Sequence, residues 1–223
     1  MSETTSKNKH ICVILSGCGF LDGAEIHEAV CSLLYISQNG STYEIAAPNK
    51  EQHHVVNHHT GEESQESRNV LVEAARIARG PVKDLKDVNA DAYDALFLPG
   101  GFGAAKNLST FAFNGPKGAI DPEVKRVIND FHNQGKPIGA VCIAPAVLAL
   151  ALGKGKVTVG TDQGTASAIE ALGSTHQNCP VTQAVVDIEN KLVTAPAYMA
   201  DAAVHDVAAG IEQAVLSVLG MCK

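Results

Sequence analysis

"KPIGAVCIAPAVLALALG", residues 136–153, is the stretch that decides the fold. Residues 136–141 predict a short buried strand, and residues 144–153 predict an apolar helix with Pro145 in its first turn. Cys142 lies in the turn between the two elements. A strand that passes directly into a helix is typical of α/β proteins, whose helices connect the strands of a parallel sheet.

The same alternation of strand and helix continues on both sides of this stretch. Residues 10–15 predict a strand, 24–40 a helix and 41–48 a second strand, which is the order of a parallel unit. Further strands are expected at 93–101, 156–161, 183–188 and 191–195, and further helices at 68–80, 121–135, 163–173 and 199–220. We therefore expect a disordered tail over residues 1–9 and one α/β domain over 10–223, with helices on both faces of a mostly parallel sheet.

Composition and charge argue against several classes of function. Apolar residues make up 45% of the 223 residues and charged residues 18%, which fits a well-packed domain. The net charge is −7 and no basic cluster occurs, so we expect no nucleic-acid partner. The longest apolar run, residues 138–153, is too short to span a bilayer, so we expect no membrane role. The start of the chain carries no signal or transit pattern, so a cytoplasmic location is expected.

The cysteines indicate buried thiols rather than a metal site. The chain has six cysteines, and none forms a C-x-x-C pair, so a structural zinc site is not indicated. In a reducing compartment most of them are expected to be small apolar core residues.

The glycine-rich segment GCGFLDG, residues 17–23, allows three interpretations. Dinucleotide binding is disfavoured, because the glycine spacing departs from the Rossmann fingerprint and the following strand ends in AAP instead of an acidic residue. A tight turn that requires positive φ is the simplest reading. The loop is also placed to present the following helix, with Glu25 and Glu28, toward a pocket at the carboxyl ends of the strands.

Cys142 has the surroundings of a nucleophile elbow. Small residues, Ala140 and Ala144, stand two positions to either side of it, as a sharp strand-to-helix turn requires. A cysteine at a helix N-terminus meets positive dipole charge and free N–H groups, which we expect to lower its pKa and favour the nucleophilic thiolate. The N–H of Ile143 and the glycines of PGG, residues 99–101, are candidate donors to an oxyanion. The alternative is an ordinary buried cysteine.

Several motifs together resemble one known family. They are VILSGCGFLDGAEIHEAV, VNHHTGE, ESRNVLVEAARIARG, LPGGFGAAKNLS, KPIGAVCIAPA and VTAPAYM. The chain resembles the ElbB/ES1 family of the DJ-1/PfpI, or class I glutamine-amidotransferase-like, superfamily. This resemblance implies a flavodoxin-like three-layer sandwich and a homodimer. It also implies a glyoxalase III-like activity, the glutathione-independent conversion of small dicarbonyls to hydroxy acids, with no cofactor or metal. The family name is associated with isoprenoid biosynthesis.

The resemblance also assigns the two central residues. The superfamily nucleophile falls on Cys142, and the superfamily carboxyl from the first helix falls on Glu28, with Glu25 as the fallback. The chain departs from many members by carrying Ile143, not histidine, directly after the nucleophile, and the expected next strand ends in Gly160 and Thr161. That departure disfavours an amidotransferase or protease triad, whereas attack of a thiolate on an aldehyde needs only one acid/base.

Other polar residues are candidate substrate contacts beside the strand-end loops. They are Glu25, His58, Arg68, Asn69 and Asn107, and the catalytic set is Cys142 and Glu28 with backbone N–H groups of Gly101 and Ile143 as the oxyanion hole. The simpler reading of the loop histidines is local hydrogen bonding, and that of the remaining polar residues is helix capping and solvation. No ligand spacing makes a metal site of the histidines at 53, 54, 58 and 59.

Three functional hypotheses follow. The first is an enzyme that converts glyoxal or methylglyoxal to a hydroxy acid through a cysteine hemithioacetal, with a small carbonyl compound as its substrate. The second is a non-catalytic protein that binds a carbonyl metabolite or senses oxidation through Cys142. The third and weakest is a glutaminase-type subunit, because the usual histidine is missing.

Overall fold

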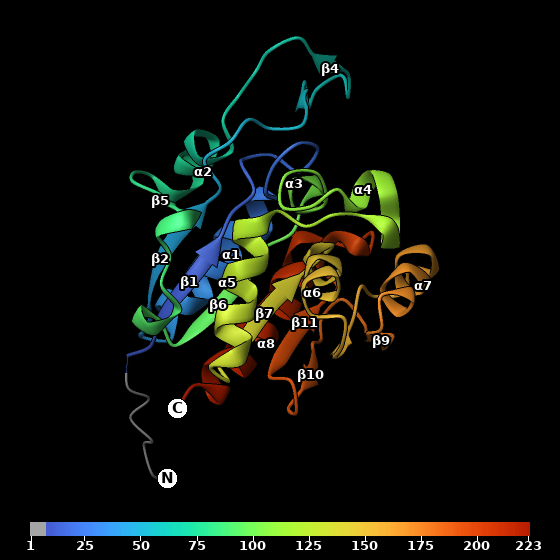
Figure 1. The fold of residues 1–223 in the computed structure, drawn as a ribbon. Coiled ribbons are helices and arrows are strands. Elements are labelled where there is room, and N and C mark those ends of the chain that lie inside the picture. Colours follow the sequence, from blue (N-terminus) through green and yellow to red (C-terminus); the bar gives the residue numbers. More distant parts are fainter. Residues whose placement is uncertain (1–7) are drawn as a thin grey trace.

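The computed structural model describes residues 8–223 (Figure 1). Residues 1–7 lie outside the described residues, and they make up most of the tail expected to be disordered. Lys9, the last residue of that expected tail, is buried, and the first strand begins at His10.

Seven strands form the central sheet in the order β10–β11–β7–β6–β1–β2–β5. Their bounds are β1 His10–Ile14, β2 Thr42–Ala47, β5 Lys83–Asp84, β6 Ala95–Leu98, β7 Ile138–Val141, β10 Val185–Asp187 and β11 Leu192–Ala195. All neighbouring pairs are parallel except the edge pair β10 and β11. In the register at the centre, Cys12 of β1 lies beside Glu44 of β2 and Leu96 of β6. The mostly parallel sheet expected from the sequence is confirmed.

Helices cover both faces of this sheet, as expected. The α-helices are α1 Ile26–Gln38, α2 Val70–Ala78, α3 Phe102–Lys106, α4 Phe111–Asn114, α5 Pro122–Asn133, α6 Ala144–Leu152, α7 Gln163–Ala171 and α8 Val204–Met221. Helices α1, α2 and α8 pack on one face, and α5 and α6 pack on the other, where they lie in front of the sheet in Figure 1. None of the helices within residues 8–223 combines the length and the apolar character needed to cross a bilayer.

The two sides of β1 show why the sheet is covered twice. Ile11 and Val13 point into the core beneath α1 and α8, whereas Cys12 and Ile14 point into the core beneath α5 and α6. Successive strand residues face opposite sides, so a strand that is apolar throughout must be buried on both faces.

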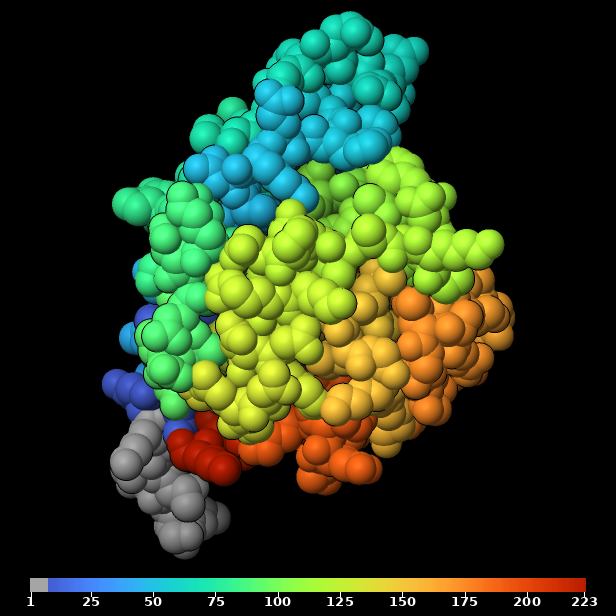
Figure 2. Space-filling view, viewed as in Figure 1, coloured from blue at the N-terminus to red at the C-terminus, as the bar shows by residue number. Residues whose placement is uncertain are grey.

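Two small pairs of strands, one antiparallel and one parallel, lie outside the main sheet. Strands β3 Val55–Val56 and β4 Glu63–Ser64 form an antiparallel hairpin, and β8 Lys156–Val157 pairs with β9 Thr175–His176 in parallel. The segment that carries β3 and β4 projects from the body of the molecule at the top of Figures 1 and 2. Four short 3-10 turns complete the described elements: η1 Leu85–Asp87, η2 Ala90–Ala92, η3 Gly115–Lys117 and η4 Ala197–Met199.

Two expected elements differ from the structure. The strand expected at 156–161 is limited to β8, because the Thr158 N–H donates to the Thr194 side chain at 2.9 Å and Gly160 adopts φ of 74°. The helix expected at 199–220 begins only at Val204, because Ala200 returns to extended backbone after the turn η4.

The sheet order brings four loops to one edge. Strands β11, β7, β6 and β1 are adjacent and parallel, so their carboxyl ends meet at the same edge of the sheet. Pockets in open α/β sheets form beyond these carboxyl ends.

Candidate active site

A cavity of about 730 Å³ opens beyond the carboxyl ends of these four strands. Each strand contributes part of the wall through the residues that follow it. The lining consists of Phe20, Glu25 and His27 after β1, Gly101 and Phe102 after β6, Cys142 and Ile143 after β7, Tyr198, Met199, Ala200 and Asp201 after β11, and Thr165 of α7.

Cys142 occupies the nucleophile elbow that its neighbours predict. Its φ of 61° lies in the left-handed region, which is strained for any residue with a Cβ. The Cys142 N–H donates to the Ala195 carbonyl of β11 at 3.0 Å, which extends the strand pairing into the turn. Helix α6 begins two residues later, with Pro145 in its first turn, where the missing N–H has no helical partner to lose. The backbone therefore aims the Cys142 side chain out of the sheet edge and into the cavity.

Glu28 reaches the cysteine from the first turn of α1 and is fully buried. One carboxyl oxygen, Oε2, accepts the Gly100 N–H at 2.9 Å, and the other, Oε1, accepts the Tyr198 N–H at 3.1 Å. A further side-chain hydrogen bond joins Glu28 to Cys142. Backbone groups from two separate loops thus fix the Glu28 carboxyl against the sulfur.

Glycine is required where the loop after β6 passes this pair. A Cβ on Gly100 would lie 2.3 Å from the Cys142 Cβ and 2.8 Å from Glu28 Oε2. Gly101 has φ of 91°, and a Cβ there would lie 2.4 Å from the backbone nitrogen of Glu25. The double glycine of the PGG turn therefore permits the backbone to approach the cysteine and the start of α1 at the same time.

Burial favours the protonated forms of Cys142 and Glu28 over the state in which both carry a negative charge. Burial, followed by the charge of Glu25, raises the pKa of Glu28 to about 8, against the opposing effect of its hydrogen bonds. Burial and the charge of Glu28 raise the pKa of Cys142 well above its ordinary value, while backbone hydrogen bonds from Gly101 and Ile143 act to lower it. Near neutral pH the Glu28 carboxyl is therefore protonated.

The expected lowering of the Cys142 pKa at the helix N-terminus is wrong in its net direction. The N–H groups of Gly101 and Ile143 do favour the thiolate, as the elbow predicts. Their effect is smaller than the cost of burial beside a second acid, which the sequence did not reveal. A protonated Glu28 removes one of the two unfavourable causes, because a neutral carboxyl carries no charge and is able to donate a hydrogen bond to the sulfur.

The glycine-rich loop is a tight turn that also presents α1. Gly17 and Gly19 adopt φ of 112° and 119°, and the Gly103 N–H donates to the Gly23 carbonyl at 2.8 Å. Glu25 then caps α1, with its carboxyl accepting the Glu28 N–H at 2.7 Å. Both the turn reading and the helix-presenting reading of the sequence are consistent with this geometry.

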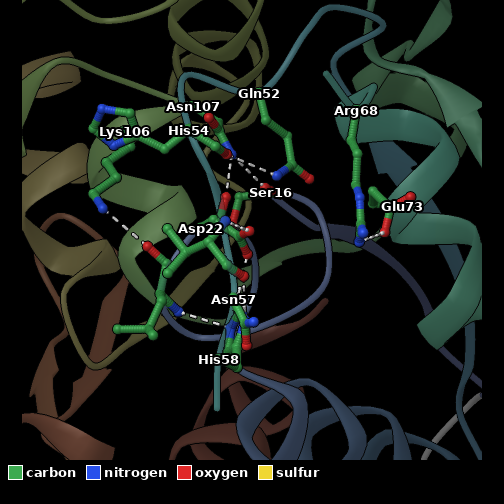
Figure 3. Close-up of polar contacts among 12 residues, drawn as sticks. Ser16, Asp22, Gln52, His54, Asn57, His58, Arg68, Glu73, Lys106 and Asn107 are labelled. Carbon is green, nitrogen blue, oxygen red and sulfur yellow. Dashed lines mark hydrogen bonds and ion pairs between the residues drawn. The ribbon is translucent and has the colours of Figure 1, made fainter. Parts of the chain in front are cut away.

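The side-chain amide of Asn107 anchors this loop (Figure 3). It is 1% exposed, and its amide nitrogen donates to the carbonyls of Ser16 and Asp22 at 2.9 and 2.8 Å. Its amide oxygen accepts the His53 N–H at 2.9 Å. Asn107 is thus a support of the loop and does not line the cavity that contains Cys142.

His58 packs against the outside of the same loop (Figure 3). Its Nε2 atom accepts the Leu21 N–H at 3.2 Å, and its Nδ1 atom lies 3.0 Å from the Val56 carbonyl. This pattern fits the neutral ring with its proton on Nδ1, and it leaves neither nitrogen free. His58 lines a separate surface hollow between the projecting hairpin and Arg68, away from the Cys142 cavity.

Two other expected contacts also belong to local structure. Arg68 pairs with Glu66 at 2.7 Å and with Glu73 at 3.6 Å, and Figure 3 shows its side chain directed at Glu73. Asn69 is the N-cap of α2 and accepts the N–H groups of Leu71 and Val72. Of the five expected substrate contacts, only Glu25 lines the Cys142 cavity.

The structure adds His27 and Tyr198 to the cavity. The Nδ1 atom of His27 lies 2.9 Å from the Tyr198 hydroxyl, and its ring also lies 4.0 Å from a Glu25 carboxyl oxygen. Ala197, with φ of 46°, turns the chain so that the next residue, Tyr198, meets both His27 and Glu28. The sequence placed His27 off the Glu28 face of its helix, and nothing in the local pattern signals a partner 171 residues away.

Comparison with known proteins gives a consistent set of relatives. The sequence profile of the DJ-1/PfpI family matches residues 18–204. The chain is 48% identical over 219 residues to the Homo sapiens "Glutamine amidotransferase-like class 1 domain-containing protein 3, mitochondrial", covering 94% of this chain and 82% of that protein. It is 47% identical over 228 residues to the Rattus norvegicus "ES1 protein homolog, mitochondrial", covering 98% and 86% respectively.

Solved structures share the fold. A crystal structure of an isoprenoid biosynthesis protein with an amidotransferase-like domain from Ehrlichia chaffeensis superposes with a TM-score of 0.89 at 40% identity, covering 95% of this chain and 99% of that one. Glyoxalase III from Candida albicans superposes with a TM-score of 0.61 at 16% identity, covering 94% and 97%. The second likeness concerns the fold alone. The expected flavodoxin-like α/β sandwich and the ElbB/ES1 resemblance are confirmed.

The same comparisons correct the expected cytoplasmic location, which is wrong. Both relatives are named as mitochondrial proteins, and so is the ES1 protein of Danio rerio, which is 34% identical over 233 residues. The expectation rested on the lack of a targeting pattern in the first residues of the sequence, and such a lack does not determine a location.

Proposed function

The chain belongs to the DJ-1/PfpI family, and on that premise we propose that it converts small 2-oxoaldehydes to 2-hydroxy acids without glutathione. The observation that carries this proposal is the contact between Cys142, at a strained elbow, and the buried carboxyl of Glu28 at the base of a cavity. A nucleophile and one acid/base in contact are the minimum that this reaction requires.

The first step joins Cys142 to the substrate. The sulfur attacks the aldehyde carbon, a C–S bond forms, and the carbonyl electron pair moves to the oxygen. The thiol gives up its own proton to water as it attacks, because the raised pKa of Cys142 keeps it protonated beforehand. The proton carried by Glu28 neutralises the substrate oxygen and gives a hemithioacetal. We assign the stabilisation of the developing oxyanion to the N–H groups of Gly101 and Ile143, because both groups act on the sulfur beside which it forms.

The second step moves hydrogen between the two substrate carbons. Glu28, now a carboxylate, removes the proton from the carbon that carries sulfur, and the electron pair forms an enediol with the adjacent carbonyl carbon. Return of that proton to the adjacent carbon, together with transfer of the hydroxyl proton from the first oxygen to the second, gives a 2-hydroxy thioester. Water then attacks the thioester, breaks the C–S bond and releases the 2-hydroxy acid and the thiol. The aldehyde carbon is oxidised and the ketone carbon is reduced within one molecule. The overall reaction therefore converts one dicarbonyl and one water to one 2-hydroxy acid.

The protonation state of Glu28 near neutral pH supports this sequence of steps. A carboxyl with a pKa of about 8 is protonated when the substrate arrives, and it becomes a stronger base than an ordinary carboxylate after it has given up its proton. A general acid or base works best when its pKa is near the working pH.

His27 and Tyr198 supply a second route for protons in this proposal. Their hydrogen bond lies in the wall of the same cavity, and the His27 side chain is 59% exposed, so the pair connects the cavity to solvent. We assign them the exchange of protons with water during thioester hydrolysis. This role replaces the histidine that the chain lacks next to Cys142.

We also propose that the protein resides in mitochondria and forms a homodimer. The names of the mitochondrial relatives support the location. A stripe on the outer face of α1 supports self-association: Ile26, Val30 and Leu34 are spaced four apart and are 43%, 49% and 52% exposed. Light scattering would give the mass in solution, and a monomer that is unchanged by Val30→Glu would contradict the homodimer.

The enzymatic proposal is tested by product formation with three proteins. Wild type, Cys142→Ser and Glu28→Gln would each be incubated with glyoxal and methylglyoxal in the absence of glutathione, and the hydroxy acid would be quantified. Multiple turnovers by wild type alone are expected. Loss of dicarbonyl in a one-to-one ratio to protein, with no product released, would favour the carbonyl-binding or redox-sensing protein. Ammonia release from glutamine would favour the amidotransferase.

A further inference from the structure

The cavity around Cys142 is much larger than glyoxal or methylglyoxal requires. Its volume of about 730 Å³ lies within the roughly 300–1,000 Å³ range of pockets that enclose a drug-sized ligand. Of the reacting pair only Cys142 lines this cavity, and Glu28 is buried behind it. The remaining wall is therefore available to select the group attached to the carbonyl.

Part of that remainder is an apolar wall, defined as Phe20, Phe102, Ile143 and Met199. Phe20 and Phe102 are 46% and 47% exposed, although they are large apolar residues in a protein with few aromatics. The Phe102 N–H donates to the Phe20 carbonyl at 2.7 Å, so the two backbone segments that carry these residues are fixed beside each other. Exposed aromatic side chains that line a cavity are typical of a site that receives an apolar group.

The permanently charged side chains of the lining have a single sign. The carboxylates Glu25 and Asp201 form an acid rim, His27 is the titratable base beside them, and within residues 8–223 the lining contains no lysine or arginine. Lys106 lies with its Nζ 5.2 Å from the Phe102 ring, but it donates to the Leu21 carbonyl at 2.9 Å and does not line the cavity. A carboxylate or phosphate in this cavity would meet two like charges and would find no lysine or arginine as its partner.

We propose that the substrate of this site carries an uncharged apolar group, aryl or branched alkyl, on the carbonyl carbon, and that the site rejects anionic carbonyl compounds. This inference rests on the proposed function for the reaction, but the recognition itself depends only on the wall and the rim. Ile143 follows the nucleophile directly, so the apolar group lies against the residue beside the reacting sulfur.

The first arm of the test measures recognition without turnover. Cys142 would be alkylated with iodoacetamide, N-phenyliodoacetamide and its 4-carboxyphenyl analogue, and the rate at each cysteine would be followed by peptide mass spectrometry. Cys31, partly exposed on α1 and outside the lining, reports the intrinsic reactivity of each reagent. The Cys142-to-Cys31 rate ratio is expected to rise by about tenfold with the phenyl group and to fall by about tenfold when the carboxylate is added.

Substitutions in the apolar wall and in the acid rim test whether these residues cause the preference for the phenyl reagent. Phe102→Ala is expected to abolish the phenyl preference, and Asp201→Asn is expected to relieve the rejection of the carboxylate. Phe113→Ala is the matched control, because Phe113 is 44% exposed on α4 and does not line the cavity. Thermal unfolding would check that each variant folds, and Met199→Ala provides a second wall variant should Phe102→Ala fail to do so.

The second arm compares kcat/KM for methylglyoxal, phenylglyoxal and 4-carboxyphenylglyoxal. Phenylglyoxal is expected to exceed both others by about tenfold. Preference in alkylation without hydroxy-acid formation would reject the proposed reaction and leave this inference intact. Turnover of methylglyoxal with equal alkylation by all three reagents, or equal rates for the two aryl substrates, would overturn the inference and leave the reaction intact.

Discussion

Glu28 and Cys142 meet across a single glycine: a Cβ on Gly100 would lie 2.8 Å from Glu28 Oε2 and 2.9 Å from Cys142 Sγ. The same glycine donates its N–H to Glu28 Oε2 at 2.9 Å. Gly100 therefore both leaves room for the pair and orients the acid. The contact between nucleophile and acid depends on a residue that has no side chain of its own.

Gly100→Ala is expected to separate the pair. The new methyl group would displace the buried Cys142 and Glu28 side chains, and overpacking of this kind costs about 1–3 kcal/mol of folding stability. The rate of hydroxy-acid formation should also fall, because the nucleophile and the acid no longer lie in contact. Gly220→Ala is the control, because a Cβ there meets nothing within 4 Å and the helix should gain up to about 1 kcal/mol. A Gly100→Ala protein with wild-type stability and turnover would contradict this reading.

Folding stability should depend on pH through Glu28. Its pKa is raised from 4.5 to about 8 in the folded protein, so the folded state binds the proton more tightly than the unfolded state does. Its contribution is fully present below about pH 4.5 and is lost as the pH rises through about 8, by up to about 5 kcal/mol.

Glu28→Gln, which cannot ionise, should remove that part of the dependence. Urea unfolding at pH values from about 4 to about 9, which enclose the two pKa values, would measure it. Glu189→Gln, at an exposed position after β10, is the control and should leave the slope unchanged. Equal slopes for wild type and Glu28→Gln would show that Glu28 titrates as an ordinary carboxyl.

The strain at Cys142 should be visible in a pair of variants. With φ of 61°, any residue with a Cβ is penalised there by about 1–2 kcal/mol, whereas glycine is not. Cys142→Gly is therefore expected to be at least as stable as Cys142→Ala in chemical denaturation. At Ala140, buried in β7, Ala→Gly should instead cost about 1 kcal/mol or more. A Cys142→Gly protein clearly less stable than Cys142→Ala would reject the strain.

Tyr198→Phe separates the proton route from the positioning of Glu28. The variant loses the hydroxyl that contacts His27 but keeps the backbone N–H that donates to Glu28. The value of kcat is expected to fall by roughly tenfold to a hundredfold, while the alkylation rate of Cys142 stays the same. Tyr35→Phe, on α1 and outside the cavity, serves as the control. An equal loss in both variants, or a changed alkylation rate, would assign Tyr198 a structural role.

His58 and His59 offer a matched pair for the glycine-rich loop. His58→Ala removes the acceptor of the Leu21 N–H and the contact to the Val56 carbonyl, which should cost about 1 kcal/mol of stability. His59→Ala, at an exposed neighbouring position, should change stability by less than about 0.5 kcal/mol. Turnover should survive in both. Complete loss of turnover in a folded His58→Ala protein would return His58 to the list of catalytic candidates.

The elbow was predictable because its determinants are local. Ala140, Ala144 and Pro145 act through backbone sterics within a few residues of Cys142, and a pattern of residue sizes is visible in a sequence. The parallel sheet was predictable for the same reason, since strand and helix periodicity is local. For Glu28, by contrast, the loop indicated only that it faces a pocket together with Glu25, and its role beside Cys142 was assigned through resemblance to a family.

The wrong or missing predictions concern contacts between distant segments. His27 and Tyr198 are 171 residues apart, so neither signals the other. The raised pKa of Cys142 arises from burial beside Glu28, which depends on the packing of α1 against the loop after β6. The truncated strand β8 likewise follows from a hydrogen bond to Thr194, 36 residues away. Local sequence patterns do not indicate contacts between residues that are distant in the sequence.

The construction of the cavity from four separate loops has an evolutionary consequence. The reacting pair is fixed by backbone groups of Gly100 and Tyr198, which most substitutions elsewhere leave untouched. Phe20, Phe102 and Met199 lie in three different segments, which follow β1, β6 and β11, and can be exchanged one at a time. A lineage that keeps its nucleophile and acid is thus free to drift from one carbonyl compound to another, and chains that share this chemistry need not share a metabolite.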